Sequence, residues 1–414
     1  MRLKDNILLF FVYIFSVFID LFNGYIQQVH DSNSFIPILF KGGVILYLIR
    51  YVLKLSNVVA KYTRLLLIFY FISLGYWIGA GYYSIPSYEI NLILKFVYPY
   101  FVLSYLMYKY KSPVDLLYKY PIFYAVIGAI SIYMAFFWGM GVGAYGGVDN
   151  AYGFGVKGFF KATNDTGIML LICSCFTCYL YSITRKKRYL LILILLSFST
   201  MLIGSVAGTM GSILIFNLFF ISLFFRFRDV KFSFRIKFVL SIIYAIVLFS
   251  AISIAVYIIT YDEYMLKKYG SITALLFEDH ARAPMTETAQ KIFDSFSFLD
   301  YIFGQGYSAF HLFFGKSYAG LNIPTLVEKD VYDLLGGYGL LLGGNLLLFP
   351  CLILFISVKK FFQYRSVELY WSTIGLCLYI FHGIYAGHAF GSVISSTFVV
   401  IIYYMVLKYR RIVL

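Results

Sequence analysis

The sequence predicts an all-α, polytopic membrane protein: one integral membrane domain, 1–414, with about twelve transmembrane helices and two long outer-face loops. Composition is the first reason, because 61% of the 414 residues are hydrophobic and only 13% are charged, with a mean hydropathy of +0.82. Soluble chains average about 45–50% apolar and about 25% charged residues. The second reason is that the apolar residues gather in runs of the ~20 residues that a helix needs to cross the hydrocarbon. The third is a regular alternation of basic and acidic connections.

The same composition excludes several classes of protein. It does not fit a disordered chain, a collagen-like fibre or an ordinary cytosolic enzyme. The five cysteines lie inside apolar stretches and give no disulfide framework, so a secreted disulfide scaffold is excluded as well. We interpret these cysteines as small core residues.

Twelve apolar runs follow one another along the chain, and each is interpreted as one span. They lie at 7–26, 36–53, 64–82, 90–108, 118–138, 165–183, 188–206, 209–225, 236–259, 333–357, 369–387 and 390–407. No small-residue cleavage site follows the first run, so we expect an anchor rather than a signal peptide. The boundary around Gly204–Gly211 is the weakest division between two helices.

The distribution of charge predicts that both termini are cytoplasmic. With Met1 inside, the inner segments carry 24 of the 34 Lys and Arg residues and four acids, whereas the outer segments carry eight basic residues and 14 acids. Cytoplasmic connections of membrane proteins show this excess of Lys and Arg. The net charge of +15 is therefore a consequence of topology and does not indicate nucleic-acid binding.

Two outer segments are longer than turns. The first, 139–163, is rich in Gly and aromatic residues, and the second, 260–332, holds nine of the 14 outer acids and is expected to form a lid. Within the second, 286–303 is predicted to form one amphipathic helix. Its apolar face consists of Ile292, Phe293, Phe296, Leu299 and Phe303. Because its polar face has no excess of Lys or Arg, we expect this helix to pack on the protein rather than on the outer leaflet.

Two lysines lie at membrane depth. Lys41 and Lys95 are each about five residues inside the outer end of a predicted helix. They either extend to the interface by snorkelling or form an anion site just below the outer surface. Asp20, near the outer end of the first helix, is either interfacial or the partner of one of these lysines.

A second group of polar residues precedes the predicted helix at 165–183. Lys157 and Lys161 stand just before Asn164 and Asp165, which are good N-cap residues. Helix N-termini attract anions, so this segment is either a phosphate-binding feature or a capped loop with solvated lysines.

The long outer segment contributes further candidates. Arg282 is the only arginine in any outer segment and suits a phosphate or a carboxylate, although neighbouring acids offer it a structural ion pair. His311 lies downstream. Glu328 and Asp330 precede a predicted helix, where acids favour the helix dipole but also provide a general base or an acceptor for a sugar hydroxyl.

The last outer turn contains His382 and His388. Two histidines without a matching set of ligands are a weak metal signal, so we predict neither a metal site nor a cofactor. His388 is retained as a candidate proton acceptor.

Taken together, these features resemble the O-antigen ligase/polymerase superfamily and, within it, the Wzy-type polysaccharide polymerases. The resemblance covers about 139–392. It is carried by Lys157-Gly-Phe-Phe160 followed by Asn164, by a long outer loop with one Arg, by Phe303-Gly-Gln-Gly306, and by Glu328-Lys-Asp330 ahead of Gly336-Gly-Tyr-Gly339.

The resemblance implies a glycosyltransferase in the bacterial inner membrane. Such an enzyme transfers a growing glycan from undecaprenyl diphosphate onto the sugar of another carrier-linked repeat unit at the outer face. It implies lipid-linked oligosaccharides and membrane lipids as partners, and leaves open whether a chain-length regulator binds. An essential arginine of the family maps onto Arg282, whereas Lys157 stands where the first loop has another arginine.

Together, these readings assign two sets of residues. Arg282, Glu328, Asp330 and His388 are assigned to catalysis, and Lys157, Lys161, Asn164, Lys41, Lys95 and His311 to binding of the diphosphate or glycan. Two alternatives stay open. A ligase would use the same donor with a lipid A–core acceptor, but Glu328-Lys-Asp330 stands where such ligases have a His-Asn motif. A flippase or transporter for lipid-linked sugars is the other, although its charged sites would be expected near the midplane and in repeated halves.

Overall fold

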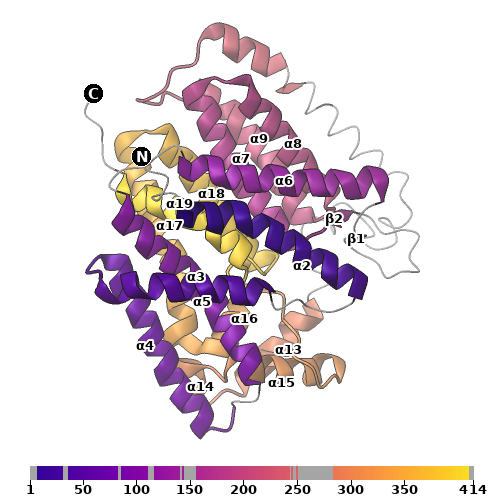
Figure 1. The fold of residues 1–414 in the computed structure, drawn as a ribbon, viewed down its shortest axis with the longest axis vertical. Coiled ribbons are helices and arrows are strands. Elements are labelled where there is room, and N and C mark those ends of the chain that lie inside the picture. Colours follow the sequence, from indigo (N-terminus) through magenta and orange to yellow (C-terminus); the bar gives the residue numbers. More distant parts are fainter. Residues whose placement is uncertain are drawn as a thin grey trace.

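The computed structural model describes residues 7–30, 36–82, 85–110, 116–139, 142–143, 155–242, 244–245, 249 and 283–409. These residues form a bundle of long helices with one short two-stranded ribbon (Figure 1). The first half of the chain contains α1 (Ile7–Leu9), the π-helical η2 (Phe10–Phe15), α2 (Ser16–His30), α3 (Ile36–Lys54), α4 (Val58–Gly79), α5 (Pro86–Lys109) and α6 (Leu116–Trp138). The antiparallel strands β1 (Val142–Gly143) and β2 (Val156–Gly158) follow.

The second half begins with three helices, α7 (Thr163–Thr184), α8 (Lys187–Leu202) and α9 (Val206–Phe224). The description resumes at residue 283. The helices that follow are α13 (Ala283–Asp294), α14 (Phe298–Phe303), α15 (Tyr307–Ala319), α16 (Asp330–Tyr338), the π-helical η3 (Gly339–Gly344), α17 (Asn345–Tyr364), α18 (Val367–Tyr385) and α19 (Val393–Lys408).

The structure confirms a multi-pass, all-α membrane protein. Within the described residues, nine helices are long and apolar enough to cross a membrane, and α19 is a shorter apolar helix. Eleven of the twelve predicted runs coincide with helices, and most of the run at 236–259 lies outside the described residues. The count of twelve spans therefore stays a prediction. The weak division near Gly204 is real, because Gly204 adopts φ +75° and the Ser205 side chain accepts a hydrogen bond from the Gly208 amide to begin α9.

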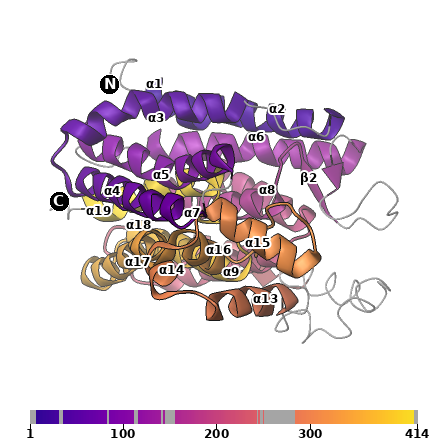
Figure 2. The ribbon, with the colours of Figure 1, turned by 90° about the horizontal axis from the view of Figure 1, so that it is seen from below.

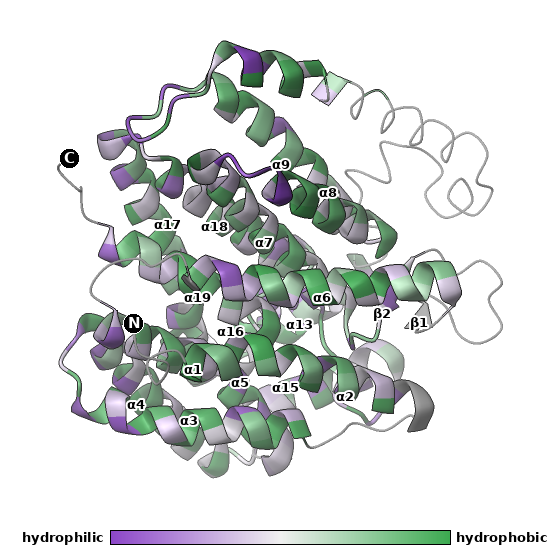
Figure 3. Cartoon of the chain, turned by 45° about the horizontal axis from the view of Figure 1, so that its top comes forward, coloured by the Kyte–Doolittle hydropathy of each residue, from purple (hydrophilic) through white to green (hydrophobic). Residues whose placement is uncertain are grey.

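Among the described spans, α7 is the most buried and α5 is the second most buried. Buried tyrosines connect distant helices: Tyr13 donates to the Thr397 carbonyl (2.9 Å) and Tyr404 to the Tyr110 carbonyl (3.0 Å). Polar groups at membrane depth need such internal partners, because hydrocarbon offers none. Peripheral helices instead expose apolar side chains, such as Leu46 of α3 (73%) and Phe71 of α4 (65%). Hydrophobic residues predominate along the long helices (Figure 3). A surface this apolar fits contact with lipid rather than water.

Residues 283–329, here named the cap, lie beside the bundle, and both α15 and β2 lie toward the side opposite the start of α1 (Figure 2). The prediction of one amphipathic helix over 286–303 is wrong, because Ser297 forms a capping box with Asp300 and starts a new helix, α14. Packing on the protein is confirmed for part of the predicted face. Ile292 and Phe296 are buried against Phe310, whereas Leu299 is 47% exposed.

Polar contacts hold the cap against α4. The Trp77 indole donates to the carbonyls of Phe303 (3.0 Å) and Gly304 (3.1 Å), and the Tyr76 hydroxyl donates to the Asp300 carboxylate (2.9 Å). Gly304 adopts φ +71°, and a Cβ there would lie 2.4 Å from the Gly337 carbonyl oxygen. The glycines of the Phe-Gly-x-Gly segment and of the start of η3 therefore permit a backbone contact between the cap and the bundle.

Replacing Trp77 by Phe tests this junction. The variant Trp77→Phe leaves the Phe303 and Gly304 carbonyls buried without the indole donor, which costs about 1–3 kcal/mol. We expect a lower thermal unfolding midpoint for the detergent-solubilised protein. Phe71→Leu, on the lipid-facing side of the same helix, is the matched control and leaves the midpoint unchanged. Equal midpoints for Trp77→Phe and the unmodified protein would contradict the role given to the indole.

Candidate functional site

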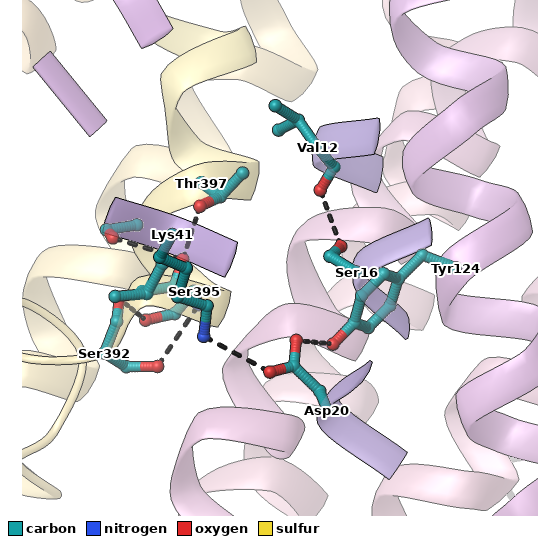
Figure 4. Close-up of polar contacts among 10 residues, drawn as sticks. Val12, Ser16, Asp20, Lys41, Tyr124, Ser392, Ser395 and Thr397 are labelled. Carbon is teal, nitrogen blue, oxygen red and sulfur yellow. Dashed lines mark hydrogen bonds and ion pairs between the residues drawn. The ribbon is translucent and has the colours of Figure 1, made fainter. Parts of the chain in front are cut away.

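Side chains from several helices converge at one end of the bundle. This group, here named the lysine cluster, consists of Asp20, Lys41, Lys95, Lys161, Asp165 and His388. Lys41 Nζ lies 3.2 Å from Asp20 Oδ1, and the Tyr124 hydroxyl donates to Asp20 Oδ2 at 2.9 Å (Figure 4). Of the two readings for Asp20, pairing with a membrane-depth lysine is confirmed.

Lys95 lies deeper than the sequence predicts. Because α5 begins at Pro86, Lys95 is nine residues into the helix, about 13 Å along its axis, and not about five residues. It interacts electrostatically with Asp165, Lys41 and Lys161. No carboxylate of the described residues lies within ion-pair distance of its ammonium group. Lys95 therefore adds a cation to this group of charges without a direct counter-ion in the described part of the chain.

Lys157 and Lys161 are carried by β2 and the turn after it. Phe160 anchors this turn, since it is 1% exposed and stacks on Tyr124. The Lys157 ammonium donates to the Lys161 carbonyl at 3.1 Å. Burial lowers the pKa of both lysines, and for Lys161 the nearby Asp165 carboxylate opposes that effect. Lys157 is half-buried, whereas Lys161 is exposed, so an anion can reach its ammonium group from solvent.

Asn164 does not cap α7, so that prediction is wrong. The N-cap residue is Ala162, and no side chain caps the helix. The Asn164 amide instead donates to the Ala386 carbonyl at 3.0 Å, in the segment between α18 and α19. This contact brings the start of α7, with Asp165 in its first turn, against the segment that carries His388.

The segment between α18 and α19 holds His388 in an unusual conformation. His388 adopts φ +63°, a left-handed conformation that costs a non-glycine residue about 1–2 kcal/mol. Asp330 supports it, because Oδ1 accepts from the His388 amide and Oδ2 from the Phe390 amide, both at 2.8 Å. Strained residues that their surroundings hold in place occur often at functional sites. His388 is partly exposed and interacts electrostatically with Asp165.

Of the remaining predicted residues, Glu328 and Asp330 lie against this segment, whereas His311 is buried at Asp333. Glu328 also adopts a positive φ (+61°), and its carbonyl oxygen would lie 2.3 Å from a Cβ at Gly387. Asp330 is 4% exposed, and both of its oxygens accept amide hydrogen bonds. His311 has no exposed surface and lies 2.7 Å from Asp333. In this structure Asp330 and His311 are thus placed as supporting residues, without a surface that a glycan reaches.

Arg282 lies outside the described residues, so the structure places no side chain for it.

One buried carboxylate, that of Glu89, was not predicted as a site residue, because the predicted span began one residue after it. The carboxylate is 1% exposed and accepts from the Ser308 amide at 2.9 Å, in the first turn of α15. Its only sequence signal is an acid beside an apolar run.

The lysine cluster combines ammonium groups, two carboxylates and a partly exposed imidazole. Ammonium groups bind anions such as phosphate as point charges. An imidazole accepts or donates a proton near neutral pH. Among the residues that the structure describes, no three His, Cys, Asp or Glu side chains lie together as a set of metal ligands. The arrangement suits binding of a phosphorylated ligand next to a proton acceptor.

The dependence of His388 on Asp330 can be measured. In Asp330→Asn the side chain loses its charge and turns an NH₂ group toward one of the two amides. We expect peptides spanning 386–392 to exchange amide hydrogens at least about tenfold faster, since a hydrogen bond to a charged group contributes about 1.5–3 kcal/mol. Glu287→Gln, at an exposed position of α13, serves as control. Unchanged exchange in Asp330→Asn would show that the carboxylate does not hold the segment.

No protein-family model matches this chain, and no curated protein matches it. The function is therefore inferred from the residues of the lysine cluster and their supports, together with the sequence features described above.

Proposed function

We propose that the protein is a polysaccharide polymerase. It transfers a growing glycan from undecaprenyl diphosphate onto a sugar hydroxyl of another carrier-linked repeat unit. The single observation that supports this most is the position of His388. It is strained and partly exposed, and it lies near Asp165, the carboxylate that also interacts with Lys95 and Lys41. Glycosyl transfer from a diphosphate needs both a proton acceptor and cations.

The proposed reaction is one displacement. The acceptor hydroxyl oxygen forms a bond to the anomeric carbon of the donor sugar, and the bond from that carbon to the diphosphate oxygen breaks. The diphosphate leaves with the electron pair, and the hydroxyl proton passes to the His388 imidazole. Lys161, Lys95 and Lys41 stabilise the charge that develops on the leaving group. Asp330 acts as a positioning residue through the His388 backbone.

Arg282 and Lys157 complete the proposal from the sequence. As the only outer arginine, Arg282 is proposed to bind the diphosphate through its planar set of donors. Lys157 is proposed as a second cation near the first outer loop. The charge pattern supports a site on the outer face of a bacterial inner membrane, with both termini in the cytoplasm. The partners are lipid-linked oligosaccharides and membrane lipids.

One observation favours a second candidate. The depth of Lys95, nine residues into α5, is also expected of a transporter for lipid-linked sugars, whose charged sites lie well inside the membrane. A ligase with a lipid A–core acceptor would share the same donor site. An assay of the purified protein with carrier-linked repeat units distinguishes the polymerase, ligase and transporter functions. Longer glycan on the carrier indicates a polymerase, transfer to lipid A–core a ligase, and movement without transfer a transporter.

His388→Asn tests the proton acceptor. Asn tolerates the left-handed backbone that His388 adopts, so the segment keeps its shape while the base is lost. We expect the rate of glycan elongation to fall by about 10²–10⁴, the usual contribution of a general base. Lys316→Ala, in the last turn of α15, is the matched surface control. Normal elongation by a well-folded His388→Asn protein would remove His388 from the mechanism.

Arg282→Ala and Arg282→Lys test the diphosphate partner. Because Lys binds phosphate without the bidentate geometry of Arg, we expect Arg282→Lys to retain part of the activity and Arg282→Ala to retain less. Polymer length and amount in cells, with expression checked on the same samples, are the measurement. Unchanged polymer in both variants would show that the assignment of Arg282 is wrong.

A further inference from the structure

A cavity opens beside the lysine cluster between α3, α5 and the start of α19. Its volume is about 60 Å³, and its walls include Lys41 and Gly42 of α3, Asn91 and Lys95 of α5, and Val393 of α19. We propose that this cavity binds the phosphate group of a membrane lipid that approaches from the bilayer between α3 and α5. The inference rests on the proposed function in that Lys41 and Lys95 are assigned there to the leaving diphosphate. It deepens that function by naming the class of lipid bound and its route of entry, and the binding itself requires no glycosyl transfer.

The polar lining of the cavity suits an anion. Lys41 and Lys95 both line it, and Asp20 neutralises only Lys41 by direct contact. Val393 is the first residue of α19, so the amide end of that helix also borders the cavity. Helix N-termini add partial positive charge. The Asn91 amide supplies a neutral hydrogen-bond donor.

Two consecutive glycines of α3, Gly42 and Gly43, border unoccupied space, and Gly42 lines the cavity. A Cβ added to Gly42 or to Gly43 would meet no atom within 4 Å. Glycine inside a helix costs about 1 kcal/mol relative to alanine, and membrane helices usually accept that cost where another backbone packs closely. No described backbone packs closely on Gly42 or Gly43. Gly42 instead leaves space in the cavity next to Lys41, one residue away.

The surroundings favour a lipid over a soluble anion. Pro37, Ile38 and Leu94 form apolar walls of the same cavity. Next to the lining residues in sequence, Leu39 of α3 is 72% exposed and Ile90 of α5 is 50% exposed, as expected of side chains that face acyl chains. A lipid phosphate brings its apolar chains to such a surface, whereas a free phosphate would exchange bulk water for apolar walls.

The test measures binding of a fluorescent phosphatidic acid to the full-length protein in neutral detergent. We expect saturable binding that fluorescent diacylglycerol, which lacks the phosphate, does not show. Lys95→Met and Gly42→Leu weaken the affinity about tenfold or more, equivalent to about 1.4 kcal/mol. Gly43→Leu, which also enters open space but is not part of the cavity wall, stays within about twofold of the unmodified protein.

Three results would overturn the proposal. These are equal binding of phosphatidic acid and diacylglycerol, equal affinities of Gly42→Leu and Gly43→Leu, and tight binding of inorganic pyrophosphate that the same two variants weaken. The last result would identify a soluble-anion site. Since Gly42→Leu fills empty space, it keeps the test valid even if Lys95→Met fails to fold. Glycan elongation is measured separately, so loss of the polymerase proposal leaves the binding result readable.

Discussion

The carboxylate of Asp330 connects the parts of the molecule on which the candidate site depends. It stands at the start of α16, directly after the cap, and binds two amides of the segment between α18 and α19. That segment also receives the Asn164 amide from the start of α7. Three regions far apart in the chain therefore meet at His388. Without a fixed acceptor for these amides, a left-handed backbone at a non-glycine residue would relax.

The same principle recurs along the junction between the cap and the bundle. Asp300 accepts from Tyr76, Glu89 from the Ser308 amide, and Asp333 from the Val327 amide. Each is a buried carboxylate that accepts from a hydroxyl or from backbone N–H groups, and Asp333 also contacts the His311 imidazole. Charge-assisted bonds of this kind are stronger than neutral ones where the surroundings exclude water. The described part of the second long connection, residues 283–329, is therefore a cap that packs on the bundle through these contacts.

Most of the described helices could be predicted from run length alone, because a span needs about 20 apolar residues. The start of α5 could not, since Ser87, Glu89 and Asn91 interrupt the apolar pattern although Pro86 begins a helix. The roles of Asn164 and Asp330 depend on partners 222 and 58 residues away, which no local pattern reveals. The Lys41–Asp20 pair could be proposed from depth, because charges inside a membrane seek each other.

The balance of charge explains why a phosphorylated ligand suits this end of the bundle. Lys41, Lys95 and Lys161 face two carboxylates, Asp20 and Asp165, so one positive charge is left over before His388 is counted. An excess charge in a partly desolvated site is unfavourable unless a counter-ion neutralises it. In the proposed function, a phosphate supplies that counter-ion. As the diphosphate leaves the sugar in the proposed reaction, its charge increases, and its attraction to the lysine cluster grows with it. Binding energy that rises during the reaction is what accelerates a chemical step.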